Sequence, residues 1–430
     1  METTTRESRL WHPFADMGAV QGNEFVIDRA EDVWVWDADG NRYFDSTAAL
    51  WYVNAGHGRT EIIDAVANQM RRLAAYHTFG DFSNEPASRL ADRLAELAPM
   101  DDARVFLASG GGDGIDTAYK IARRWWFERG EADRTHIVTR MHGYHGTHGF
   151  GTAIAGIPAN REHWGPLPED NTVVPYDSVD AFSDAVRRLG ADRVAAIFVE
   201  PVIGAGGVYP PPPGYIEGIA EICRSTGVLF ICDSVIAAFG RLGTWFGIER
   251  FGVRPDMVVF AKGVTSGYQP LGGVVVSGRI AEPFFAGAGG PMLRHGPTYA
   301  GHPAVCAAAL ANLDVLERDG LVDRGRELEE PLLATLQRCA EHPIASEARG
   351  GVGAMAALSL DPDVLSADPL APNKVSAKAR AHGLIIRPVA NALVCSPPLT
   401  TTQEHLDLLG EGLSAALDDV RAELPAASKA

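Results

Sequence analysis

From about residue 104 onward, short apolar runs alternate with stretches of helical periodicity. The apolar runs cover residues 104–108, 135–139, 194–199, 228–232, 257–261 and 273–277. Strands that are buried on both faces form such continuous apolar runs, and their alternation with helices is typical of a mainly parallel sheet. The pattern therefore predicts an α/β domain in the middle of the chain.

The two ends of the chain have different patterns. Residues 24–46 predict strands, with a hairpin turn at Asp39-Gly40. After about residue 320 the chain predicts a helix, a strand-like stretch near 351–360 and a final helix after Thr400. The pattern after residue 320 therefore predicts a smaller α+β unit.

The composition narrows the class of protein. The 430 residues suffice for one large domain and a smaller one. The net charge of −17 argues against nucleic acid and anionic membranes as partners. The five cysteines form no CxxC pair, and the first ten residues lack the apolar core of a signal peptide. No apolar stretch is long enough for a membrane span, so we expect a cytoplasmic protein.

A lysine and an aspartate each follow one of the apolar runs. Lys262 ends the run 257–261 and leads into a turn rich in Gly, Thr and Ser, and Asp233 ends the run 228–232. The carboxyl ends of parallel strands meet at one edge of the sheet, where ligands bind. Taken alone, a lysine is more often exposed and an aspartate often caps a helix. The pair suits pyridoxal phosphate (PLP), which needs a Schiff-base lysine and a carboxylate beside its pyridinium nitrogen.

Other motifs also follow strands. A glycine-rich turn at 109–114 precedes a helix, where backbone amides favour phosphate, although a turn without a ligand is equally consistent. Tyr144 is a flat aromatic residue among glycines and suits stacking on a ring, and Val235 can press on the same ring. The three histidines of the segment 142–148 have no standard metal-binding spacing, so we expect no metal.

Two further positions allow two interpretations each. Glu200 ends the run 194–199 and serves equally well as a polar support near a cofactor or as a loop cap. Thr298 can donate its hydroxyl to a phosphate or cap the helix that follows.

Several longer segments have the order and spacing of one family. They include LWHPFADM, VWVWDADGNRYFD, AALWYVNAGHGR, EPVIGAGGVYPPPPGY, AKGVTSGYQPLGGVVVS, GPTYAGHP and IIRPVANALVCSPPL. Over nearly its whole length the chain resembles the class III (omega) aminotransferases of the PLP fold-type I enzymes. The resemblance implies a large domain with a mainly parallel, seven-stranded sheet and a smaller α+β domain formed by both termini. We assign residues 1–60 and 321–430 to the small domain and 61–320 to the large, PLP-binding domain.

The resemblance also implies roles for single residues. Lys262 would hold PLP as a Schiff base and move the substrate proton, and Asp233 would pair with the pyridinium nitrogen. Tyr144 and Val235 would enclose the ring between them. Of these four residues, Lys262 and Asp233 would be the catalytic ones.

Phosphate and substrate contacts are implied in the same way. The backbone amides of Gly111 and Gly112 would bind the phosphate, together with Thr298 of the partner subunit in a homodimer or a dimer of dimers. Arg387 would clamp a substrate carboxylate, for which a guanidinium is better suited than an ammonium. The remaining substrate-binding positions would be Trp51 and Phe14.

The chain also departs from the family pattern. Gly112 stands where the family usually has serine, so one side-chain phosphate contact is lost, worth about 1–2 kcal/mol if nothing replaces it. Ser234 stands where it has glutamate, and we have no account of that change. The apolar stretch 393–399 occupies a place where some relatives that use α-ketoglutarate carry an arginine. We therefore expect transamination between a primary amine or omega-amino acid and a keto acid, pyruvate in the first place, through PMP and ketimine intermediates.

Three alternatives stay open. An aminomutase or racemase of the same fold would use the same cofactor without releasing a keto product. The second alternative is a homologue that binds PLP but is not catalytic. A nicotinamide dehydrogenase would need an acidic residue about 20 positions after the glycine turn, and that stretch offers only Glu128, Glu131 and Asp133, in an expected helix and loop.

Overall fold

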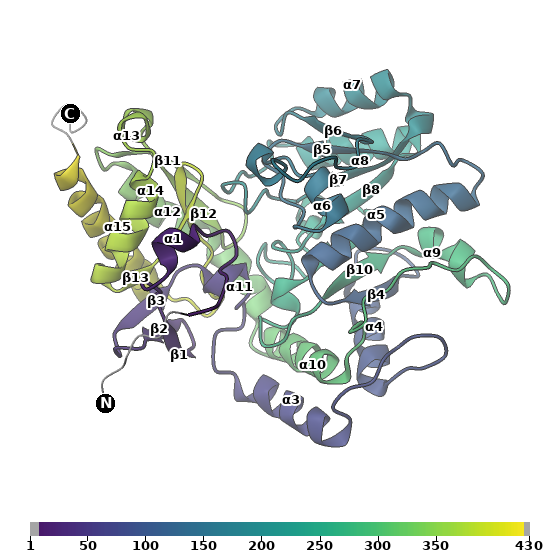
Figure 1. Ribbon diagram of the computed structural model, residues 1–430, viewed down its shortest axis with the longest axis horizontal. Coiled ribbons are helices and arrows are strands. Elements are labelled where there is room, and N and C mark those ends of the chain that lie inside the picture. Colours follow the sequence, from purple (N-terminus) through teal and green to yellow (C-terminus); the bar gives the residue numbers. More distant parts are fainter. Residues whose placement is uncertain (1–7, 425–430) are drawn as a thin grey trace.

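A seven-stranded sheet forms the centre of the larger of two lobes in the computed structural model, which describes residues 8–424 (Figure 1). The strand order is β4-β10-β9-β8-β7-β5-β6, and among these strands only β10 runs antiparallel to its neighbours. The strands are β4 (Arg104–Ala108), β5 (His136–Arg140), β6 (Asn171–Val174), β7 (Val194–Val199), β8 (Leu229–Asp233), β9 (Met257–Phe260) and β10 (Gly272–Val276). The expected α/β fold with a mainly parallel sheet is confirmed.

Helices cover both faces of this sheet. Ile231 and Val259 pack in one buried cluster with α5 (Gly111–Glu128) and α9 (Gly278–Phe285), whereas their neighbours Phe230 and Val258 pack in the cluster of the other face. This alternation follows from the opposite directions of successive side chains along a strand. The other helices of this lobe are α3 (Thr60–Arg72), α4 (Glu85–Leu97), α6 (Gly149–Ala153), α7 (Val179–Leu189), α8 (Tyr215–Thr226) and α10 (Pro303–Arg318).

The smaller lobe combines both ends of the chain. One sheet has the order β1-β2-β3-β13, in which β13 (Leu384–Ile385) pairs in parallel with β3 (Arg42–Asp45). The turn expected at Asp39-Gly40 joins β2 and β3. The other elements of the lobe are α1 (Met17–Val20), β1 (Ile27–Glu31), β2 (Trp34–Asp37), α2 (Ala48–Trp51), α11 (Leu321–Glu327), α12 (Glu329–Ala340), β11 (Ala345–Arg349), β12 (Ala356–Leu360), α13 (Pro362–Ala367), α14 (Ala371–Ala379), β14 (Arg387–Val389), β15 (Ala392–Cys395) and α15 (Gln403–Glu423).

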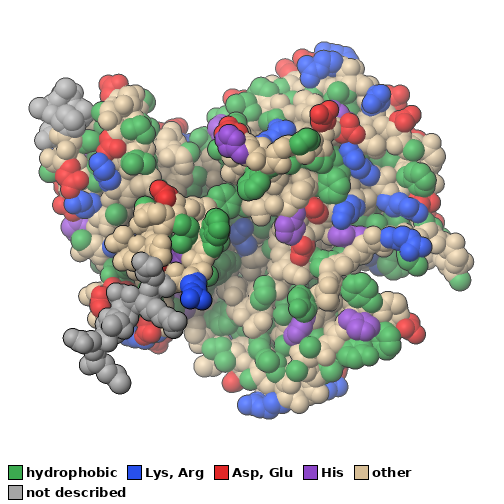
Figure 2. All heavy atoms as spheres, in the orientation of Figure 1, with side chains coloured by type: hydrophobic (Ala, Val, Ile, Leu, Met, Phe, Trp, Pro, Cys, Tyr) green, Lys and Arg blue, Asp and Glu red, His purple; other side chains and the backbone are tan. Residues whose placement is uncertain are grey.

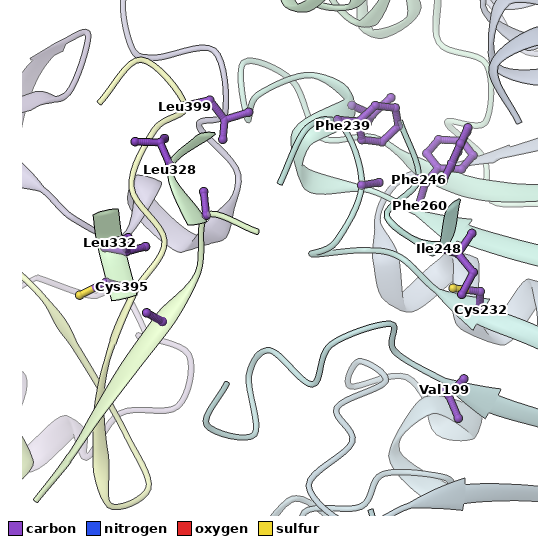
Figure 3. Packing of buried hydrophobic residues seen from close by; sticks show 14 of the residues in the cluster. Val199, Cys232, Phe239, Phe246, Ile248, Phe260, Leu328, Leu332, Cys395 and Leu399 are labelled. Atoms are coloured by element: carbon purple, nitrogen blue, oxygen red, sulfur yellow. The ribbon is translucent and has the colours of Figure 1, made fainter. Parts of the chain in front are cut away.

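Apolar packing continues from one lobe into the other. Figure 3 shows Leu332 and Cys395 of the smaller lobe in the same buried cluster as Phe239 and Phe260 of the larger one. Burial of such side chains is the main favourable term in folding, so this shared core holds the two lobes together. Within residues 8–424, no helix is long and apolar enough to cross a bilayer.

Candidate active site

Three ionisable side chains lie where three neighbouring parallel strands end. Glu200 follows β7, Asp233 is the last residue of β8, and Lys262 follows β9 after one residue. β8 pairs in parallel with both β7 and β9, so the three side chains reach the same edge of the sheet. The expectation that Asp233 and Lys262 lie at one edge is thus met by the geometry.

A cavity of about 180 Å³ lies at this edge. It brings together six of the predicted cofactor residues, which come from four separate segments of the chain. These six are Gly111, Gly112, Tyr144, Asp233, Val235 and Lys262. Its other lining residues are Ile115, His145, Gly146, Thr147, His148, Glu200, Ile236 and Ala261.

The Asp233 carboxylate is held by two hydrogen bonds. His145 Nδ1 donates to Asp233 Oδ2 at 2.8 Å, and the Val235 backbone amide donates to Oδ1 at 3.1 Å. Both His145 and Asp233 are buried. Burying a carboxylate without hydrogen-bond partners is costly, so these two donors stabilise Asp233 at its place in the cavity. The role of His145 was not predicted from the sequence; its position next to Tyr144 was the available signal.

Glu200 supports the loop that carries Tyr144. Its carboxylate accepts hydrogen bonds from the backbone amides of Tyr144 at 3.1 Å and Gly204 at 2.9 Å. Burial, followed by the repulsion of the Asp233 carboxylate, raises the pKa of Glu200. Glu200 therefore supports a loop and also lines the cavity, and its role beside a cofactor stays a prediction.

Lys262 has an unusual backbone and an unusual charge environment. Its φ angle of 50° lies in the left-handed region, which is uncommon for a residue with a side chain. Burial lowers the pKa of Lys262, against the opposing attraction of Asp233 and Glu200. A lysine with a lowered pKa is neutral over a wider pH range, and a neutral amine can attack a carbonyl or accept a proton.

The N-terminus of α5 forms the floor of the cavity beside Val235. A Cβ placed on Gly111 would lie 3.0 Å from Val235 Cγ1, so a side chain there would crowd the wall of the cavity. The unpaired amides of a helix N-terminus bind anions, and this helix has 18 residues. The cavity can therefore accept a phosphate at this end.

Arg387 reaches the same region from the smaller lobe. It lies in β14 opposite Val394 of β15 and is close enough to Lys262 and Tyr144 to affect the pKa of each. Burial lowers the pKa of Arg387 itself. Among the residues that the structure describes, no carboxylate forms an ion pair with Arg387, so its guanidinium is available to a ligand.

Arg387 and the three other predicted site residues do not line this cavity. Phe14 lines a neighbouring cavity of about 810 Å³, which shares Gly146 and Thr147 with the first. Trp51 is buried in an apolar cluster with Ile236, and Thr298 is exposed on the surface. In Figure 2 hydrophobic side chains line the hollow between the two lobes.

The cavity has the complementary groups that PLP requires. A carboxylate, a lysine, an aromatic wall and a helix N-terminus match, in turn, the pyridinium nitrogen, the aldehyde, the ring and the phosphate. The chemistry of the residues that line the cavity is therefore compatible with PLP.

Comparison with known proteins gives a consistent result. The family model described as "Aminotransferase class-III" matches residues 17–417. A putrescine–pyruvate aminotransferase of Pseudomonas aeruginosa is 35% identical, over 95% of this chain and 96% of its own. A diaminobutyrate–2-oxoglutarate transaminase of Halomonas elongata is 36% identical, over 89% and 87%. The crystal structure of an (S)-enantioselective omega-transaminase from Thermomicrobium roseum superposes with a TM-score of 0.90 at 39% identity, over 95% and 96%.

Proposed function

Because the chain belongs to the class III aminotransferases, which are PLP-dependent transferases of amino groups, we propose that it acts on a primary amine or an omega-amino acid and uses pyruvate as its preferred acceptor. The observation that carries this proposal is the unpaired guanidinium of Arg387 beside Lys262, next to the apolar Val394. The Pseudomonas aeruginosa relative is named for pyruvate and the Halomonas elongata relative for 2-oxoglutarate, so the acceptor has to be argued from the site itself.

The charges around the cavity favour a monocarboxylate. Arg387 can pair with one carboxylate of a keto acid. A second carboxylate, as in 2-oxoglutarate, would need another cation, but Val394 is fully buried among apolar side chains. Among the described residues that line the cavity, Lys262 is the only lysine or arginine. Burying an unpaired carboxylate is costly, which supports pyruvate over 2-oxoglutarate.

Each residue of the cavity then has a task. PLP, when bound, supplies an electron sink that stabilises negative charge on the substrate carbon. The Lys262 amine would take the proton from that carbon and return it on the other side of the amino nitrogen, at the carbon that carried the aldehyde. The Asp233 carboxylate, oriented by His145, keeps the ring nitrogen protonated. Tyr144 and Val235 hold the ring between them, and the amides at the start of α5 bind the phosphate.

We further propose that the active protein is a homodimer or a dimer of dimers. Thr298 and its neighbour Tyr299 are exposed, and Tyr299 leaves 70% of its surface accessible. The segment that carries them lies against the loop of Phe79, which is also exposed. Large exposed apolar residues of this kind mark an interface, and from there Thr298 would reach the phosphate in the partner subunit. A cytoplasmic location remains a prediction from the sequence.

A donor and acceptor screen tests the proposal. The purified protein is supplied with PLP, a set of amines and omega-amino acids, and either pyruvate or 2-oxoglutarate, and the keto product of the donor is measured. We expect the higher kcat/KM with pyruvate. Absence of any keto product would contradict transamination, and a preference for 2-oxoglutarate would contradict the acceptor assignment.

The role of Arg387 can be tested in the same assay. We expect Arg387→Ala to lower kcat/KM for pyruvate by about 10- to 100-fold, because a charge-assisted hydrogen bond is lost. The kcat/KM for an uncharged amine donor should change much less. Arg188→Ala, which removes an exposed arginine of α7, is the matched control. Equal losses for acceptor and donor would argue against a carboxylate clamp.

A further inference from the structure

The start of α5 and the loop 143–149 approach each other closely at Gly112. A Cβ on Gly146 would lie only 2.9 Å from the Gly112 Cα, which is shorter than a real contact. A Cβ on Gly112 would lie 3.3 Å from Nδ1 and 3.4 Å from Cε1 of His148. The imidazole of His148 therefore occupies the space into which a side chain at position 112 would extend.

His148 is held at this place by the helix it faces. Its Nδ1 lies 3.3 Å from Oδ1 of Asp113, whose other carboxylate oxygen accepts a hydrogen bond from the Ser109 amide at 3.1 Å. The side chain lines the cavity and remains 48% exposed. Among residues 8–424, no group pairs with its Nε2. The imidazole is thus fixed over the first turn of α5 with one nitrogen free.

We propose that His148 is a phosphate-binding residue of the cofactor site, where it supplies the side-chain donor that Gly112 lacks. The proposal rests on the proposed function, because it assumes that the phosphate of PLP lies at the start of α5. Because Nδ1 donates to the Asp113 carboxylate, Nε2 carries a hydrogen only in the protonated ring, and that ring can give a phosphate oxygen a charge-assisted hydrogen bond. His148 also pairs with the Asp113 carboxylate, which would otherwise repel the phosphate.

This arrangement couples positions 112 and 148. A serine at 112 and a histidine at 148 compete for one space, because the Cβ alone already lies within 3.4 Å of three ring atoms. Removing the imidazole makes room for a serine, whose hydroxyl can donate to the phosphate in its place. The PMP affinity that is lost in His148→Ala should therefore be restored, at least in part, by adding Gly112→Ser.

Equilibrium binding of two ligands to the full chain tests the proposal. The cofactor-free protein is titrated with PMP and with pyridoxamine, which lacks the phosphate, and binding is followed by tryptophan fluorescence. We expect His148→Ala to weaken PMP binding by about 10- to 100-fold, the effect of one charge-assisted hydrogen bond, and to leave pyridoxamine binding unchanged. His148→Gln, which keeps a donor, should retain part of the affinity. The double variant Gly112→Ser/His148→Ala should bind PMP more tightly than His148→Ala.

Two further variants separate the possible causes of a loss. His382→Ala removes a comparable histidine–aspartate pair, 2.8 Å long with Asp419, from the smaller lobe and should change neither affinity. The double variant Asp113→Asn/His148→Ala lacks the carboxylate charge that would repel the phosphate. If its PMP binding is as weak as that of His148→Ala, the result supports a direct contact between His148 and the phosphate. If its PMP affinity returns to the wild-type value, the proposal is overturned. Unchanged PMP affinity in His148→Ala, or an equal loss for pyridoxamine, also overturns the proposal. If the wild-type protein binds neither ligand, the proposed function itself fails.

Discussion

Asp233 ends β8 and Lys262 follows the adjacent strand β9, and burial lowers the pKa of the lysine. We predict that Lys262→Ala lowers the rate of amino transfer by about 10³-fold or more, because it removes both the nucleophile and the proton carrier. The measurement is keto-product formation under multiple turnover. Lys374→Ala, which removes an exposed lysine paired with Asp368, should leave the rate unchanged. Turnover by Lys262→Ala at the wild-type rate would contradict the mechanism.

The hydrogen bond between His145 and Asp233 gives a second prediction. His145→Ala leaves the buried carboxylate with a single described hydrogen-bond donor, the Val235 amide. We expect kcat/KM to fall by about 10- to 100-fold, since a hydrogen bond to a charged group contributes about 1.5–3 kcal/mol. His145→Gln should recover part of the activity if its amide reaches Asp233. The control is His136→Ala, because His136 bonds Thr172 at 2.9 Å outside the cavity; an equal loss there would indicate a general folding defect.

At the residue scale, sequence reasoning found the groups whose signal is local. Lys262 and Asp233 could be predicted because each directly follows an apolar run. His145 and His148 could not, because their partners Asp233 and Asp113 lie far away along the chain and come close only in the folded protein. The absence of a serine side chain at Gly112 was evident from the sequence, but the sequence did not indicate that His148 lies beside this position.

Among the elements, α5 is the one whose position decides the phosphate end of the cavity. It lies so close to β9 and β10 that a Cβ on Gly114 would be 2.7 Å from Val259 Cγ1 and 3.0 Å from the Gly273 carbonyl oxygen. We predict that Gly114→Ala destabilises the protein by about 1–3 kcal/mol through overpacking, although alanine favours helix. Thermal unfolding measures this effect.

A second helical glycine provides the control for this prediction. Gly410 lies in α15, and a Cβ there would contact only the Thr335 Cγ2, at 3.3 Å. Gly410→Ala should therefore be neutral or stabilise by up to about 1 kcal/mol. If both variants change the free energy of unfolding by the same amount, close packing of α5 on the sheet is not the cause.

Elements with strong patterns were predicted and short ones were missed. The six apolar runs became six strands, with ends that shift by one residue in several cases. β6 has only four residues, Asn-Thr-Val-Val, and β13 has two, so neither has enough length to show a period. Their pairing partners, β5 and β3, give them their strand conformation.

For the whole molecule, the sequence indicated the α/β class, and the chain-long resemblance indicated that both termini build one lobe. The pairing of β13 with β3, which joins residues near 384 to residues near 44, is a tertiary contact that no local pattern contains. Arg241 adds a polar link of the same kind. Its buried guanidinium donates to Asn54 Oδ1 and to the carbonyl oxygens of Ala354 and Pro397, and so connects the ends of the chain to the large lobe.

The exposed apolar surface around Phe79 leads to a prediction for the assembly. Tyr76, Phe79 and Phe82 are each about half exposed in the loop between α3 and α4, and Figure 2 shows hydrophobic and histidine side chains where Figure 1 places this loop. If this surface is the subunit interface, Phe79→Asp buries a charge there and should shift the protein from dimer to monomer. Light scattering after size-exclusion chromatography measures the mass, and PMP affinity should fall in parallel because Thr298 of the partner subunit is lost. Leu408→Asp, at a similarly exposed apolar residue of α15, should leave both the mass and the affinity unchanged. A wild-type protein that is monomeric and active would refute the shared active site.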